Sequence, residues 1–326
     1  MATSATRRIW LRRVVTWGIT VALLAWVFHT VPLAHTWAAI QDAGPATVAG
    51  LGLVYFLYSF AADVIATWAT FGWFCTRLSL RDVFGIRGAT YLLAMVNYNL
   101  GQGGIVYFVG KKRGVGIARA TGTVLLTMGV MFVALLLLAA AGSWLGDPNE
   151  PRLRLMRWIS AGGLAAFVVY LGVIVARPSF LARRAIFQPL FDAGIVGHAK
   201  AWLVRFPHVA GHVVFQWALL KLFGVHIPFL AAATLLPVTF VISWIPITVQ
   251  GLGTSQVAAV QLFSRYGTGA SLDERNAQVL AFSLVLSALF MVYSLIVGLL
   301  FLRTEIARDT VHASGASGTA DQDSDA

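Results

Sequence analysis

Asn97-Tyr98-Asn99-Leu100-Gly101-Gln102-Gly103-Gly104 interrupts an apolar segment that covers residues 88–110. The segment is long enough to cross a membrane, but basic residues flank it on both sides, with Arg81 and Arg87 before it and 111–113 after it. A full crossing would put one basic cluster outside, against the preference of Lys and Arg for cytoplasmic loops. Three glycines in four residues also disfavour a continuous helix. We therefore predict a re-entrant hairpin that enters and leaves from the cytoplasm, with its break buried in protein or lining a wet cavity.

The composition around this stretch excludes a soluble protein. Of the 326 residues, 58% are hydrophobic and only 11% are charged, against about 25% charged residues in an ordinary soluble domain. We predict an all-α integral membrane protein with membrane lipids as its partners. The net charge of +11 would suggest nucleic acid in a soluble chain, but here the basic residues are divided among short loops, so we expect no nucleic-acid partner. Cys75 is the single cysteine, which excludes an intrachain disulfide and a cysteine-based metal site.

The apolar pattern predicts six crossings and two re-entrant hairpins. A basic N-terminus (1–13) precedes a membrane domain (14–305), and a Ser-, Gly- and Asp-rich tail (306–326) is expected to be disordered. Eighteen of the 24 basic residues then lie inside, which predicts a plasma (inner) membrane protein with both termini cytoplasmic. The same apolar segments could also be counted as eight transmembrane helices. The predicted crossings are 14–31, 47–74, 120–146, 158–176, 206–224 and 277–302, and the hairpins are 88–110 and 228–266.

The second hairpin is interrupted at Pro246-Ile247-Thr248-Val249-Gln250-Gly251-Leu252-Gly253. Each half of the chain (14–146 and 158–302) then holds two crossings, a hairpin and a crossing, which is the order of an inverted repeat in secondary transporters. Chance similarity of two glycine-rich breaks is the alternative. Half-helix ends at the breaks would present oriented dipoles to an anion, unless the glycines only allow tight packing.

The two broken motifs, each followed by a basic or Gly-containing turn and an apolar helix, resemble the lysylphosphatidylglycerol synthase transmembrane-region family over about residues 7–305. The resemblance implies a flippase-like domain that moves aminoacylated or glycosylated lipids between leaflets. In this family an acidic residue often follows Gly-Leu-Gly, but Ser255 and Gln256 stand here instead, which puts a cationic headgroup in doubt. No aminoacyl-transferase domain follows the membrane part in this sequence, so we do not expect the chain to make a lysyl lipid itself.

Asp63 is the only acidic residue within a predicted crossing. A carboxylate in the membrane is costly and suggests a headgroup contact or a proton-coupled step, with a structural hydrogen bond to a neighbouring helix as the alternative. With the residues of the two breaks it completes the predicted substrate-binding set: Asp63, Asn97, Asn99, Gln102, Gly103, Gly104, Pro246, Gln250, Gly251, Gly253 and Ser255.

His208 and His212 share a predicted helical face with Arg205 and Gln216. Two histidines at this spacing can bind zinc, but without a third ligand nearby a polar stripe facing the bundle interior is the better interpretation. The sequence has no Walker A or nucleophile-elbow motif, and we expect no metal and no cofactor.

The function predicted from the sequence is translocation of an anionic or glycosylated lipid, with its headgroup held between the two breaks. The alternatives are a membrane-embedded lipid or glycosyl transferase, and a non-catalytic subunit whose partner is a separate synthase or glycosyltransferase. The sequence leaves the oligomeric state open.

Overall fold

The computed structural model describes residues 18–245, 247–248 and 251–320, with the backbone alone from 302 onward. This part of the chain is helical, and its one β-bridge joins Val225 to Gly267. After a first helix at Gly18–Thr30, the elements are α2 (Leu33–Asp42), α3 (Pro45–Phe74), α4 (Leu80–Val96), α5 (Tyr98–Arg113), α6 (Ile117–Leu145), α7 (Pro151–Ala176), α8 (Ser179–Ala182), α9 (Gln188–Leu222), α10 (Phe229–Trp244), α11 (Thr254–Phe263), η2 (Ser264–Tyr266) and α12 (Leu272–Ala320).

Four helices are long and apolar enough to cross a membrane: α3, α6, α7 and the Leu272–Phe301 part of α12. They match four of the six predicted crossings and confirm a multi-pass membrane protein. The first helix and α2 form a broken pair bent by 85°, which counts as a fifth span if it is taken as one. The segment 32–46 between the first two predicted crossings contains the helix α2, since no glycine or proline interrupts residues 33–42.

The predicted crossing 206–224 is the second half of a much longer helix. α9 begins at Gln188, so a large part of the segment 177–205 between two predicted crossings is helical, with a kink at Gly194, whose φ is +52°. α9 packs between α3 and α6 and carries buried polar side chains, which is why its sequence is less apolar than that of the four crossing helices.

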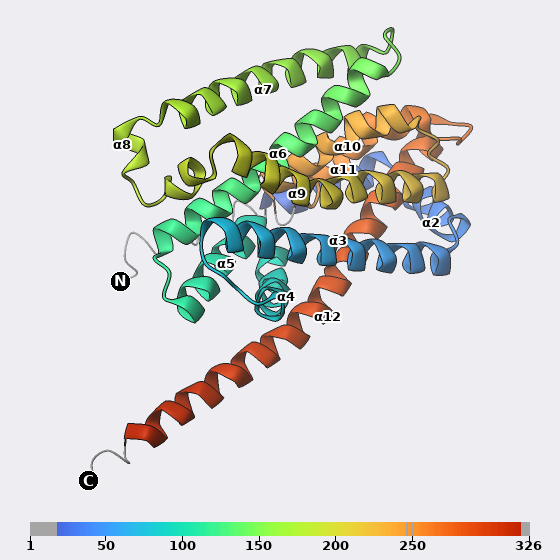
Figure 1. Cartoon of the computed structure of the whole chain (residues 1–326). Helices are drawn as coiled ribbons and strands as arrows, with labels where there is room; N and C mark the ends of the chain where they lie inside the picture. The colour runs from blue at the N-terminus through green and yellow to red at the C-terminus, as the bar shows by residue number, and fades with distance from the viewer. Residues whose placement is uncertain (1–17, 246, 249–250, 321–326) are drawn as a thin grey trace, which may run out of the picture.

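Both predicted hairpins are present, and they enter the bundle from opposite ends. α4 packs against α5, and α10 packs against α11. At the base of the first hairpin, where α4 begins and α5 ends, Arg113 donates to Asp82. This base lies next to the end of α3. At the base of the second hairpin, the His226 amide donates to the Tyr266 carbonyl oxygen. This base lies next to the end of α9. Because α3 and α9 are antiparallel, these two bases lie at opposite ends of the bundle (Figure 1).

The tips of the two hairpins meet inside the bundle. The ring of Tyr98, the first residue of α5, stacks on the ring of Trp244, the last residue of α10, with centroids 5.2 Å apart. The arrangement of two opposed helical hairpins agrees with the fold predicted from the sequence. The internal symmetry of the two halves stays a prediction.

The first break lies within the predicted stretch but is shorter than predicted. Only Asn97 is non-helical between α4 and α5, and the three glycines at 101, 103 and 104 belong to α5. A Cβ on Gly101 would come within 2.8 Å of the Ala94 Cβ, and one on Gly104 would meet Leu93 and Thr90. These two glycines therefore allow α4 and α5 to pack closely, which outweighs their low helix propensity.

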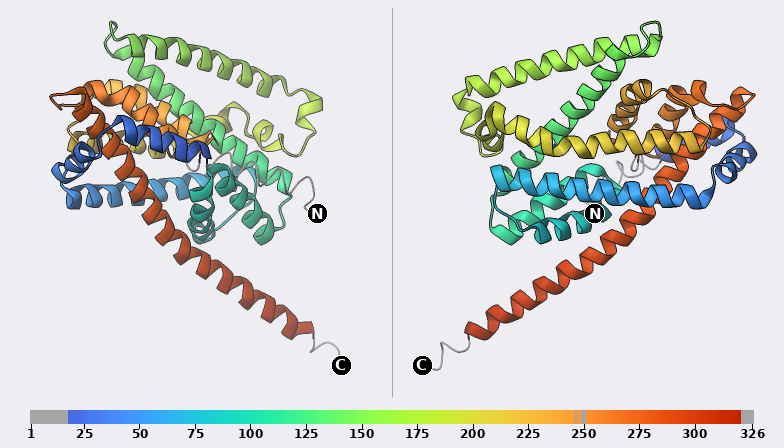
Figure 2. Two further views of the ribbon diagram at one scale, coloured as in Figure 1. Left: turned by 180° about the vertical axis from the view of Figure 1, so that it is seen from behind. Right: turned by 45° about the vertical axis from the view of Figure 1, so that its right-hand side comes forward.

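At the periphery, α7 lies along one side of the bundle, and the end of α12 projects away from it (Figures 1 and 2). α12 continues as helix to Ala320. No proline stands between 303 and 326 to end the helix. The division into domains, including the disordered tail over 306–326, stays a prediction.

Candidate functional site

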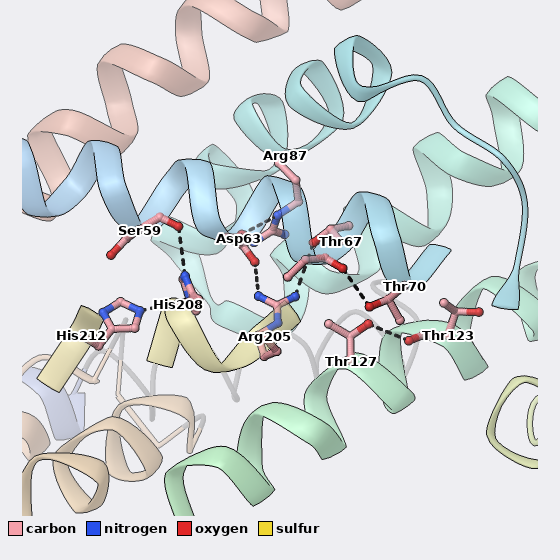
Figure 3. A network of polar contacts seen from close by, with 11 residues as sticks. Ser59, Asp63, Thr67, Thr70, Arg87, Thr123, Thr127, Arg205, His208 and His212 are labelled. Atoms are coloured by element: carbon pink, nitrogen blue, oxygen red, sulfur yellow. Dashed lines mark hydrogen bonds and ion pairs between the residues drawn. The ribbon is translucent and has the colours of Figure 1, made fainter. Parts of the chain in front are cut away.

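Asp63 sits in the middle of α3 and is bonded by two arginines from other helices (Figure 3). Arg87 of α4 donates from Nε to Asp63 Oδ2 over 2.7 Å and from a second nitrogen to the same oxygen. Arg205 of α9 donates to the other carboxylate oxygen. All three side chains are buried, with Asp63 only 4% exposed. The structural hydrogen bonds to neighbouring helices, the alternative given for Asp63, are therefore present, and its functional role stays a prediction.

This cluster holds two guanidinium groups and one carboxylate, so one positive charge is left uncompensated in the protein interior. Burying an uncompensated charge is costly unless another group neutralises it. The two bonds to Asp63 engage only two of the five N–H groups of Arg87. The cluster is therefore a natural place for an anionic ligand.

The predicted spans leave Arg87 just before the hairpin 88–110 and Arg205 just before the crossing 206–224, both outside the apolar segments, and this placement is wrong. Arg87 lies a full two turns inside α4, between Ile86 and Gly88, and Arg205 lies in the middle of α9. The available signal was the apolar sequence on both sides of Arg87, which continues from Val83 to Val96 and is unusual for a loop. For Arg205, the polar stripe with His208 was the signal, but only the fold shows that Asp63 is its partner.

A cavity of about 200 Å³ lies next to Asp63 and Arg87 at the meeting point of the hairpin tips. We call it the arginine chamber. Besides these two residues its lining includes Ser59, Tyr98, Gln102 and Trp244. Ser59 is 2% exposed, and its hydroxyl has no hydrogen-bond partner among the described residues. Arg205 lies behind Asp63 and lines a much smaller void of about 10 Å³. The chamber thus combines a cation, an unpaired hydroxyl and the amide of Gln102.

A chain of hydrogen bonds leads away from this chamber along α9. The Nδ1 atom of His208 lies 3.0 Å from the carbonyl oxygen of Ser59, so Nδ1 carries the proton of this histidine. The Nε2 atom of His208 then accepts from Nε2 of His212, 3.1 Å away. His212 accepts in turn from the Tyr55 hydroxyl, and Gln216 donates to Tyr55. These tautomers are assigned from the hydrogen-bond network. The prediction of a buried polar stripe on α9 is confirmed.

The stripe ends at a second cavity, of about 210 Å³. We call it the serine chamber, because Ser243, Ser255, Ser283 and Ser287 line it. The Ser255 hydroxyl is buried and has no hydrogen-bond partner among the described residues. Both chambers share His212, Phe240, Ser243 and Phe290 in their walls. The two cavities therefore adjoin at the tip of the second hairpin.

The structure brings only some of the predicted substrate-binding residues to these chambers. Asp63 and Gln102 line the arginine chamber, and Ser255 lines the serine chamber. Asn97 instead caps α5, with its side-chain oxygen accepting from the amide of Asn99, which is exposed.

The glycines of the predicted substrate-binding set shape turns and helix contacts around the chambers. Gly251 and Gly253 have φ values of +72° and +89°, which favour glycine and turn the chain into α11. Gly103 is exposed and Gly104 packs on α4. Pro246 and Gln250 lie outside the described residues.

No group of three His, Cys, Asp or Glu side chains that could hold a metal occurs within the described ranges. The comparison with family models gives one match, to the transmembrane region of lysylphosphatidylglycerol synthase, over residues 9–272. No curated protein matches the chain.

Proposed function

Because the chain belongs to the lysylphosphatidylglycerol synthase transmembrane-region family, which suggests a function connected with membrane lipids, we propose that it translocates an anionic lipid between leaflets. The lipid phosphate binds in the arginine chamber, and the acyl chains stay in the surrounding hydrocarbon. In this proposal the protein lies in the plasma membrane with both termini in the cytoplasm.

The observation that carries the proposal is the net positive charge of the buried cluster formed by Asp63, Arg87 and Arg205, which lies beside a cavity. A phosphate there would neutralise the excess charge and could accept from the N–H groups of Arg87 that Asp63 does not engage. The N-terminus of α5 adds to this, because Tyr98 at its first position lines the chamber, and a helix N-terminus favours an anion.

The hairpin tips support a path across the membrane through this point. Each hairpin reaches only to the Tyr98–Trp244 contact, one from each end of the bundle. A headgroup at the contact is therefore near both half-helix ends, and a change in the packing of one hairpin on the other would open the chamber toward one leaflet or the other. Broken helices around a central site are the usual arrangement in secondary transporters.

The bonding of the cluster favours transport over a transferase reaction. A general base needs a free oxygen or nitrogen within reach of the substrate proton. Both carboxylate oxygens of Asp63 accept from arginines, and His208 and His212 bond each other. These groups are arranged to hold a fixed charge and not to move a substrate proton.

The test is reconstitution in vesicles with fluorescent lipids and an impermeant quencher that reports which leaflet each lipid occupies. We expect exchange of anionic lipid to be accelerated and exchange of phosphatidylcholine to stay at the rate of empty vesicles. Arg87→Gln, which makes the cluster neutral, should abolish the acceleration, and the exposed Arg154→Gln should retain it. Equal exchange of both lipids, or an unchanged rate in Arg87→Gln, would contradict the proposal. Appearance of a new lipid species would point to a transferase.

A further inference from the structure

The serine chamber differs from its neighbour in carrying no fixed charge. Among the described residues that line it, none is Asp, Glu, Lys or Arg. A cationic aminoacyl group would find no carboxylate there, and a second phosphate would find no cation, so either one would lose its hydration without a charged partner. The ligand part that fits this chamber is therefore uncharged.

The hydroxyl groups of the chamber are arranged mainly to accept hydrogen bonds. Thr239, Ser243 and Ser283 each donate their own proton to a carbonyl oxygen of their helix, over 2.7–3.1 Å. Their oxygen lone pairs remain available as acceptors. The Ser255 hydroxyl, which has no partner among the described residues, can both donate and accept. A ligand with several hydroxyl groups of its own would complement this set.

Aromatic side chains form much of the remaining wall. Phe240, Phe263, Phe282 and Phe290 all line the chamber, and ring faces carry a negative potential that attracts the C–H groups of a sugar ring. Apolar faces next to a few placed hydroxyls are typical of sites for small polar molecules.

From these observations we infer that the serine chamber binds a sugar or another polyol, and that the substrate is a phospholipid whose phosphate carries this uncharged, hydroxyl-rich group. The inference rests on the proposed function and narrows it from anionic lipids to this class. The two chambers share walls at His212, Phe240, Ser243 and Phe290, so the phosphate in one and the polyol in the other are parts of a single headgroup.

The experiment measures lipid binding to the purified full chain in detergent micelles, without any transport step. The probes are phosphatidylinositol, which carries a phosphate and a polyol, phosphatidic acid, which carries a phosphate alone, and lysylphosphatidylglycerol, which adds a cationic group. We expect phosphatidylinositol to bind about tenfold more tightly than phosphatidic acid, since it adds one or two hydrogen bonds in the serine chamber. Equal affinities, or tightest binding of lysylphosphatidylglycerol, would overturn the inference.

Two single substitutions locate the effect in the serine chamber. Ser255→Ala and Ser283→Ala should each reduce the preference for phosphatidylinositol severalfold and leave the affinity for phosphatidic acid unchanged. Ser143→Ala is the control matched to Ser283, because Ser143 is also buried and also donates to a carbonyl oxygen of its own helix, but it lies in α6, outside the lining of both chambers. A preference that survives both chamber variants, or that Ser143→Ala also removes, would place the polyol elsewhere and contradict the inference.

A water-soluble headgroup without acyl chains tests whether the ligand is a lipid or a free polar molecule. Glycerophosphoinositol, which has the same phosphate and polyol without acyl chains, should compete only weakly, and competition as strong as that of the lipid would refute a lipid ligand. The outcomes for the two proposals also differ. Selective binding without exchange in vesicles would refute translocation and leave the polyol site standing, whereas exchange of all anionic lipids at one rate with equal affinities would refute the polyol site alone.

Discussion

Replacing Asp63 with asparagine should destabilise the protein strongly, because it leaves two buried guanidinium groups without their counter-ion. Asp63 accepts three charge-assisted hydrogen bonds, two from Arg87 and one from Arg205, each worth about 1.5–3 kcal/mol. The amide oxygen of asparagine can retain part of this set, while its NH₂ group faces a donor. We therefore expect the free energy of unfolding to fall by about 3–5 kcal/mol, the usual range for a broken buried pair.

The chain offers a matched control in Asp192. This residue also lies between two arginines, 3.3 Å from Arg177 and 3.7 Å from Arg119, but its side chain is 39% exposed. Asp192→Asn should cost less than about 1 kcal/mol, because water solvates the charges that remain. Both aspartates pair with two arginines, so the difference between the two losses of stability measures the effect of burial.

The assay is equilibrium unfolding of the purified variants in mixed micelles. A double variant, Asp63→Asn with Arg205→Met, should be more stable than Asp63→Asn alone, because it removes one of the two unpaired cations. The reasoning is refuted if Asp63→Asn costs no more than Asp192→Asn, or if the second substitution adds to the loss.

Two further predictions concern the first hairpin and its topology. Gly101→Ala should lower the free energy of unfolding by about 1–3 kcal/mol through overpacking against α4. Gly103→Ala should raise it by about 0.5–1 kcal/mol, because a Cβ on Gly103 meets nothing within 4 Å. The same unfolding assay measures both, and equal effects of the two variants would contradict the prediction. In a Cys75→Ser background, an impermeant thiol reagent added outside should label a cysteine at the exposed Ala34 and not one at the exposed Gly116, and outside labelling of position 116 would show that residues 88–110 cross completely.

The two hairpins could be predicted because their signals are local. A glycine-rich interruption within an apolar segment and, for the first hairpin, the basic residues at both ends are properties of neighbouring residues. The extent of the first break could not be predicted, because glycine has low helix propensity wherever it occurs. Only the packing of Gly101 and Gly104 on α4 shows that these glycines lie within a helix and allow close contact. The second break was placed correctly at the positive φ values of Gly251 and Gly253.

The sequence by itself determined that the chain is a multi-pass helical membrane protein, that two of its segments are interrupted, and that Asp63 is an unusual charge. It could not supply the partners of Asp63, which stand 24 and 142 residues away along the chain. An arginine beside an apolar stretch looks the same in sequence whether it faces headgroups or an acid in the interior. Only the antiparallel packing of α9 on α3, with α4 folded back as a hairpin, brings both guanidiniums to one carboxylate. The charge of the interior therefore depends on contacts between distant segments, and such contacts are fixed by tertiary structure.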